Sequence, residues 1–213
     1  MFRKGSSRRR TAVPRYFVYL SEPKIDMLYP QIPSRLLGSL EAEIKASVGL
    51  AQATIKAGLP DRGDLYTRAS VVSRYLEKHD QVGSIDQPAQ YVRGHANFSY
   101  GIPFQYLADL AFFGAITGTG KVGLIGSPES MIGAVQRNET EHSVFYYTLA
   151  FLRQLADQEA AGDSELPYFG YSEAFDIAMK ACKLKVNAEF LAKVIHHEPG
   201  LLLATPLYVA ATD

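Results

Sequence analysis

Three hydroxyl-bearing residues occupy similar places in the sequence. Ser21, Ser127 and Thr205 each follow an apolar run with strand character and precede a proline by one or two residues, in "VYLSEP", "LIGSP" and "LLATP". If the three strands are neighbours with the same sense, their hydroxyls gather at one sheet edge, where open α/β sheets bind ligands. The amides after Gly126 and Ser127, at an expected helix start, would be placed to receive an anion. The alternative is ordinary cap and turn chemistry.

Two charged pairs have a spacing of two residues. Lys24 and Asp26 lie in a stretch expected to be extended, and Arg93 and His95 lie in an expected strand, so each pair shares a side. Such groups at a sheet rim could bind an anion, or Asp26, His95 and Lys24 could carry out acid–base chemistry. The alternative is an exposed polar strand face. The candidate ligand-binding residues are therefore Ser21, Lys24, Arg93, Gly126, Ser127 and Thr205.

The Gly-rich stretch "AITGTGKVG", at 115–123, has the look of a phosphate-binding loop, but its spacing excludes one. Such a loop needs G-x-x-x-x-G-K-[ST] between a strand and a helix. Ala115 stands where the first glycine is required, and Val122 stands where the hydroxyl is required. The residues after Lys121 have strand character. The stretch is thus predicted to be a hairpin turn with Lys121 at its exposed shoulder.

The sequence lacks the motifs of a metal site and of a catalytic nucleophile, and it shows no cofactor motif. A single cysteine, Cys182, excludes an internal disulfide and a cysteine-based zinc site, and a buried position is favoured for it. His196 and His197 are adjacent on an expected helix, where side chains diverge by about 100°, and no H-E-x-x-H motif exists. "LIGSPE" lacks the second glycine of a nucleophile elbow. We therefore expect no metal and no cofactor.

Charge is unevenly distributed. The first fifteen residues carry six basic and no acidic side chains, which leaves 16 basic against 22 acidic residues in the remainder. We expect a basic, disordered arm at 1–14, in which Arg8, Arg9 and Arg10 could contact nucleic acid or an anionic membrane. The alternative is a solvated tail, or an arm that folds back onto the acidic body. No apolar run is long enough to span a bilayer, so a cytoplasmic protein is expected.

The remaining residues, 15–213, are predicted to form one α+β (mixed α/β) domain. Its mixed sheet is expected to contain a hairpin near 107–126 and both terminal strands, packed by five to six helices. We expect 26–34 to be extended, because its prolines disfavour helix at the preceding residues. Strands are expected over 15–20, 90–101 and 200–211, and helices over 35–57, 65–79, 142–160, 172–184 and 187–197.

Several stretches together resemble a known family. They are "RYFVYLSEPKIDMLYPQIP", "YVRG", "VGLIGSP", "EFLAKVI" and "LLATPLYVA". The family comprises uncharacterised proteins of about this length, found mainly in actinobacteria. The resemblance spans the chain from Tyr16 onward and leaves out the basic arm. It implies a stand-alone bacterial domain, and it brings no activity, cofactor or catalytic residue with it.

Three functions remain open from the sequence. The first is a non-enzymatic module that binds a small anionic or nucleotide-like ligand, or a partner protein, in signalling or defence. The second is an enzyme that acts on a phosphorylated or nucleotide-like substrate. The third is a nucleic-acid-associated protein that acts through the arm. The sequence identifies neither the ligand nor the oligomeric state.

Overall fold

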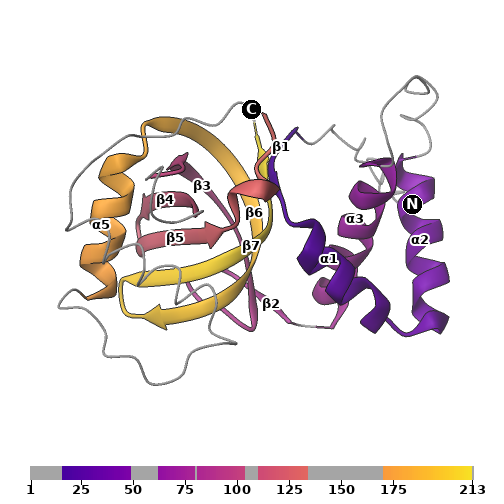
Figure 1. Ribbon diagram of the computed structural model, residues 1–213. Coiled ribbons are helices and arrows are strands. Elements are labelled where there is room, and N and C mark those ends of the chain that lie inside the picture. The colour runs from indigo at the N-terminus through magenta and orange to yellow at the C-terminus, as the bar shows by residue number, and fades with distance from the viewer. Residues whose placement is uncertain (1–15, 49–61, 80, 104–109, 134–169, 213) are drawn as a thin grey trace, which may run out of the picture.

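The structure is a computed structural model that describes residues 16–48, 62–79, 81–103, 110–133 and 170–212. These residues form a mixed α+β domain with a seven-stranded sheet and four α-helices (Figure 1). The strands are β1 (Tyr16–Leu20), β2 (Val82–Gly83), β3 (Tyr91–Gly101), β4 (Ala111–Thr117), β5 (Gly120–Gly126), β6 (Leu184–Glu198) and β7 (Leu201–Ala211). The helices are α1 (Glu22–Leu28), α2 (Ser34–Val48), α3 (Arg62–Lys78) and α5 (Tyr171–Ala181), with single 3₁₀ turns η1 (Tyr29–Gln31) and η3 (Pro128–Ser130).

Five of the strands close into a barrel. β3, β4 and β5 pair in sequence order, β5 pairs with β7 in parallel, and β6 closes the ring by pairing with both β7 and β3. β6 and β7 form a long hairpin whose turn contains Gly200 at a φ of 83°, a conformation that glycine adopts readily. The short β1 and β2 extend the sheet from β7 and β3.

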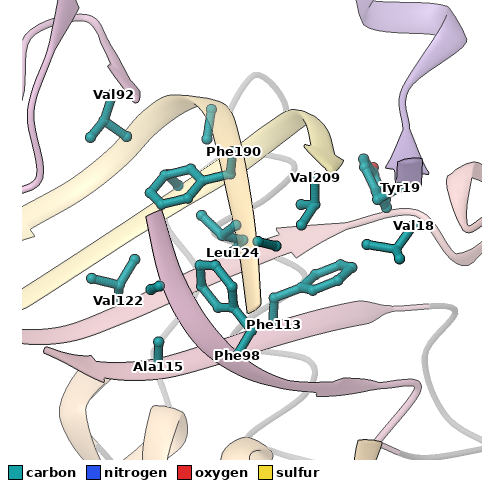
Figure 2. Packing of buried hydrophobic residues seen from close by; sticks show 14 of the residues in the cluster. Val18, Tyr19, Val92, Phe98, Phe113, Ala115, Val122, Leu124, Phe190 and Val209 are labelled. Atoms are coloured by element: carbon teal, nitrogen blue, oxygen red, sulfur yellow. The ribbon is translucent and has the colours of Figure 1, made fainter. Parts of the chain in front are cut away.

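Alternating side chains of the barrel strands fill its interior, which is a packed core. Phe98 lies edge-to-face against both Phe113 and Phe190, with ring centroids 6.2 and 5.6 Å apart (Figure 2). All three rings are fully buried, and alanines such as Ala188 and Ala192 leave room for them. Since side chains fill the interior of a small barrel, a ligand site must lie elsewhere, at an end or on the outer surface.

Helices cover the outside of the barrel on two sides (Figure 1). On one side α5 packs Phe175 against Phe112 and Leu203. On the other side α1, α2 and α3 form a helical layer whose apolar side chains pack against the outward face of β6 and β7, around Leu191 and Tyr208. None of the described helices is long and apolar enough to cross a membrane.

Several sequence expectations are confirmed. The predicted hairpin is β4–β5, and both terminal strands, β1 and β7, belong to the mixed sheet and pair with each other. α2 and α3 match the first two predicted helices over their described residues, and α5 matches the helix predicted over 172–184. Cys182 is buried at the end of α5, and burial raises the pKa of its thiol to about 12. The arm at 1–14 and the helix predicted over 142–160 lie outside the described residues.

Two expected elements are wrong. The helix predicted over 187–197 is strand β6, so the described chain has four α-helices where five to six were expected. Its Ala, Glu, Leu and Lys residues favour helix locally, but pairing on both edges with β3 and β7 overrides that preference. The stretch after Ser21 is also helical, as α1, because Pro23 lies in its first turn, where a missing N–H has no cost.

Candidate functional site

One edge of β7 is paired by two strands that run toward each other. β5 pairs in parallel with Leu201 to Ala204, and β1 pairs antiparallel with Tyr208 to Ala211. β5 and β1 therefore end on either side of 205–207, a short stretch in the middle of β7 that neither strand pairs with on this edge. The chain leaves β1 with a hydrogen bond of 2.8 Å from the Ser21 amide to the Leu207 carbonyl.

This break in the pairing explains why the three predicted hydroxyls come together. Ser21 follows β1, Ser127 follows β5, and Thr205 lies within β7 at the point where both strands end. The expected condition of three strands with one sense is wrong for β1, which is antiparallel to β7. The hydroxyls meet nevertheless, because Thr205 lies in the middle of its strand and not at the end.

A pocket of about 610 Å³ opens at the break. Its walls come from the ends of β1 and β5, from η3, from the start of α1 and from Leu65 and Tyr66 of α3, so it lies between the barrel and the helical layer. Gly126 and Thr205 contribute to the wall on the barrel side. The polar side chains that line it are those of Tyr19, Ser21, Glu22, Lys24, Tyr66, Ser127, Glu129, Ser130 and Thr205.

Lys24 brings the only lysine or arginine side chain among the described residues that line the pocket. Its Nζ donates to the carbonyl oxygen of Pro206 at 3.2 Å, and no carboxylate of the described residues forms an ion pair with it. Burial lowers the pKa of Lys24 to about 8, and the positive charge of Lys193 acts in the same direction. The site therefore holds a cationic group that has lost much of its hydration without gaining an anionic partner.

Tyr19 lies fully buried at the floor of the pocket, beside Gly126. Its Oη makes no hydrogen bond of good geometry to the described residues. Burial raises the pKa of Tyr19, while the nearby hydroxyls of Ser21 and Ser130 and the backbone of Ser127 act in the opposite direction. The phenol is thus protonated at neutral pH, and its donor lies among the other hydroxyls of the pocket.

The backbone amides after Ser127 are not placed as the sequence suggested. The expected helix start is the single turn η3, in which the amide of Glu129 donates to Ser127 Oγ at 3.3 Å. The amide of Ser130 donates to the carbonyl of Ser127 at 3.2 Å, and Pro128 has no N–H. These groups already have partners within the turn. The turn therefore offers no free amide at 128–130, and we consider the side chains of the pocket as donors to a ligand.

Arg93 lies away from the pocket, on the outward face of β3 beneath α3. Its guanidinium bonds Ser73 Oγ at 2.6 Å and Tyr208 Oη at 2.8 Å and forms an ion pair with Glu77. Tyr208 Oη in turn donates to Glu189 at 2.7 Å. The negative charges around it outweigh burial and raise the pKa of Arg93. This network fastens α3 to the barrel.

The other two acid–base candidates are also dispersed. Asp26 forms an ion pair with Arg68 of α3. His95 contacts Thr212 Oγ1 through Nε2 at 2.6 Å, beyond the end of β7. Because α1 is a helix, Lys24 and Asp26 point in different directions, and only Lys24 reaches the pocket.

Lys121, expected at the exposed shoulder of the hairpin, is instead tied to α5. Its Nζ lies 2.7 Å from Asp176 Oδ2 and 2.8 Å from Ser172 Oγ, and 5.6 Å from the ring centroid of Phe175. The described residues contain no group of three or more His, Cys, Asp or Glu side chains that could hold a metal ion.

Sequence reasoning missed Tyr19, Ser130, Glu22 and Glu129 as lining residues. Tyr19 could have been found, since it stands two residues before Ser21 and alternate residues of an extended segment share a side. The acidic residues and Ser130 carry no comparable signal, because their position depends on where the chain turns after β1 and β5.

Comparison with known proteins identifies a family for this chain and no activity. A family model described as a family of unknown function, DUF7019, matches residues 15–213. No curated protein and no solved structure shows significant similarity to the chain. Because the match covers nearly the whole chain, from 15 to its last residue, the protein belongs to the family of unknown function DUF7019.

Proposed function

We propose that this domain is a non-enzymatic binding module that takes a small anionic ligand into the pocket between barrel and helical layer. The observation that carries the proposal is the ammonium of Lys24, which lies half-buried in the pocket and has, within the described part of the chain, only a backbone carbonyl as its partner. A buried charge is stabilised by an opposite charge, and an anionic ligand would supply it.

The groups around Lys24 suit the oxygen atoms of a carboxylate or a phosphoryl group. Hydroxyls are the common side-chain donors for such oxygens. Tyr19 and Ser21 carry them at the end of β1, and Thr205 carries one in the middle of β7. A volume of about 610 Å³ lies within the ~300–1,000 Å³ typical of small-molecule sites. Glu22, at 61% exposure, and Glu129 lie toward solvent and favour a ligand whose outer part is neutral or cationic.

The location of the pocket suggests a sensor. A ligand would contact α1 and α3 on one side and the ends of β1 and β5 on the other, and so would link the helical layer to the barrel. A small molecule that favours one arrangement of two layers shifts the population toward it. A role in bacterial signalling or defence, in the cytoplasm, follows from this proposal and from the sequence resemblance, and stays a prediction.

The test is ligand-dependent thermal stability of the full chain. We would titrate phosphate, a small carboxylate, a nucleoside monophosphate and a cyclic nucleotide, each against wild type, Lys24→Met and the exposed control Lys185→Met. A ligand at 100 times its Kd stabilises the folded state by about 2.7 kcal/mol, which gives a melting shift of several degrees. We expect the shift in wild type and Lys185→Met and its loss in Lys24→Met.

Two results would count against the proposal. An equal melting shift in Lys24→Met would show that the ligand binds elsewhere. The absence of a melting shift with every anion tested would show that the ligand is not an anion. A chain lacking residues 1–12 serves as a further control, since the lining residues begin at Tyr19. If nucleic acid binds the full chain and not the shortened one, the arm carries a separate function.

A further inference from the structure

Lys24 differs from the other lysines whose partners the structure describes. Lys121 pairs with Asp176 at 2.7 Å and Lys78 pairs with Glu43 at 2.8 Å, so each ammonium has a carboxylate beside it. Among the described residues, Lys24 Nζ has only the Pro206 carbonyl, inside a pocket large enough for a small molecule. An amine without an anionic partner releases its proton more readily.

We propose that Lys24 forms a reversible imine with the aldehyde or ketone group of an anionic ligand bound in this pocket. The inference rests on the proposed function, because it names the chemical class of the ligand: a small compound that carries both a carbonyl and a carboxylate or phosphoryl group. The hydroxyls of the pocket would hold the anionic group, and Nζ would bond to the carbonyl carbon.

The step balances without any other reactant. The lone pair of Nζ attacks the carbonyl carbon, and the carbonyl oxygen takes up a proton to give a carbinolamine. Nitrogen then loses a proton, the hydroxyl group is protonated and leaves as water, and the C=N bond forms. One water is released for each imine, and nothing is oxidised or reduced. The hydroxyls of Tyr19, Ser21 and Thr205 line the same pocket, and in this proposal they carry these protons.

The protonation of Lys24 supports this reactivity. With a pKa of about 8, roughly one amine in ten is neutral at pH 7, against about three in ten thousand for an ordinary lysine. The charged and titratable groups that bear on it are Glu22 of α1, Tyr19 of β1, Tyr66 of α3, Glu129 of η3 and Lys193 of β6. Lys193 lowers its pKa, whereas both glutamates extend toward solvent, away from an ion pair with Nζ.

The test is reductive trapping on the folded full chain. We would incubate it at pH 7 with glyoxylate or pyruvate and cyanoborohydride, which reduces an imine to a stable amine, and map modified lysines by peptide mass spectrometry. We expect Lys24 to be labelled about tenfold or more faster than the exposed Lys180 and Lys185. Acetaldehyde, which lacks the anionic group, should give a smaller preference. Labelling of Lys24 no faster than that of the two exposed lysines would overturn the inference.

The pH dependence in wild type gives a second measurement that needs no variant. The labelling rate of Lys24, divided by that of Lys180 at the same pH, should fall as the pH rises above about 8, because most of the Lys24 amine is then already neutral. A Lys24 profile that parallels Lys180 would contradict the inference, because the amine would then be an ordinary one.

Lys24→Arg separates the two proposals. Arginine keeps the positive charge but forms no imine under these conditions, so this variant should retain part of the anion-dependent melting shift and lose the label at position 24. If wild type shows the melting shift but no preferential labelling, the imine is wrong and the binding module stands. If neither appears, both proposals fail.

Discussion

Gly126 lies directly against the phenol of Tyr19: a Cβ at position 126 would come 2.7 Å from Cζ and closer still to the hydroxyl oxygen. Tyr19 has no room to retreat, because it is fully buried and its ring packs edge-to-face on Phe113, with centroids 5.9 Å apart. The end of β5 and the floor of the pocket are therefore shaped by one close approach.

The first prediction follows from that approach. Gly126→Ala should lower the free energy of unfolding by about 1–3 kcal/mol, the usual cost of overpacking, as measured by urea denaturation. Tyr19→Phe removes the nearest atom, so the double variant should recover part of the loss. If Gly126→Ala leaves the free energy of unfolding unchanged, the phenol of Tyr19 can move aside and the floor of the pocket is not rigid.

The second prediction concerns Arg93, which lies in the network with Ser73, Glu77 and Tyr208. Arg93→Met should cost about 2–3 kcal/mol, because it leaves charged and polar partners under α3 without their donor. The matched control is Arg74→Met, which should cost much less because its ion pair with Glu43 is exposed to solvent.

The anion-dependent melting shift of Arg93→Met, compared with that of wild type, tests whether Arg93 takes part in ligand binding. The residue does not line the pocket, so the melting shift with an anion should persist in Arg93→Met once the lower starting stability is taken into account. If Arg93→Met loses the anion-dependent melting shift, Arg93 takes part in binding, as the sequence suggested.

The third prediction is a dependence of stability on pH. The pKa of Lys24 is lowered to about 8 in the folded chain, from 10.5 for an ordinary lysine. Between these values the unfolded chain binds more protons than the folded one, so the free energy of unfolding rises with pH, by at most about 1.4 kcal/mol per unit. Below pH 8 both states are protonated and the contribution is constant.

Denaturation at several pH values from 7 to 9.5 measures this slope. Lys24→Met should lack the Lys24 part of it, while Lys185→Met should keep it. Anion binding should weaken over the same range, because the ammonium loses its charge. Identical slopes in wild type and Lys24→Met would mean that Lys24 titrates as an ordinary surface lysine.

The fourth prediction concerns Cys182, whose thiol is 6% exposed and has a pKa raised to about 12 by burial. A thiol reagent should leave the native chain unmodified for as long as it stays folded, and should label one equivalent when the chain unfolds, since the thiolate is the reactive form. Rapid labelling under native conditions would show that α5 opens readily from the barrel.

The sequence predicts the pocket better than it predicts the sheet that forms it. Each of Ser21, Ser127 and Thr205 stands between a strand and a proline. This local pattern identified the three residues correctly, although the direction expected for β1 was wrong. β6 could not be predicted in the same way, because its residues suit a helix and only its pairing with β3 and β7 makes it a strand. Arg93 was misplaced for a related reason.

The misplacement of Arg93 shows what spacing alone leaves open. Alternation puts Arg93 and His95 outward on β3, and the burial of Val92 and Phe98 in the barrel agrees with that. It does not say what covers the outward face. Here α3 covers Arg93, while His95 lies beyond it beside Thr212. Which layer lies over a strand depends on the whole topology, and no local pattern carries that information.

The break in the pairing along β7 also divides this strand into two halves with different neighbours. Its first half is bound to β5 and its second half to β1, which leads into the helical layer. Opposite the break, the pairing with β6 shifts register between Leu191 and Ala192, and it shifts again just before the break, between Val194 and His196. Pro206 contributes no N–H at this point. We therefore expect β7 to bend most easily here, and a molecule in the pocket would lie across the bend and restrict it.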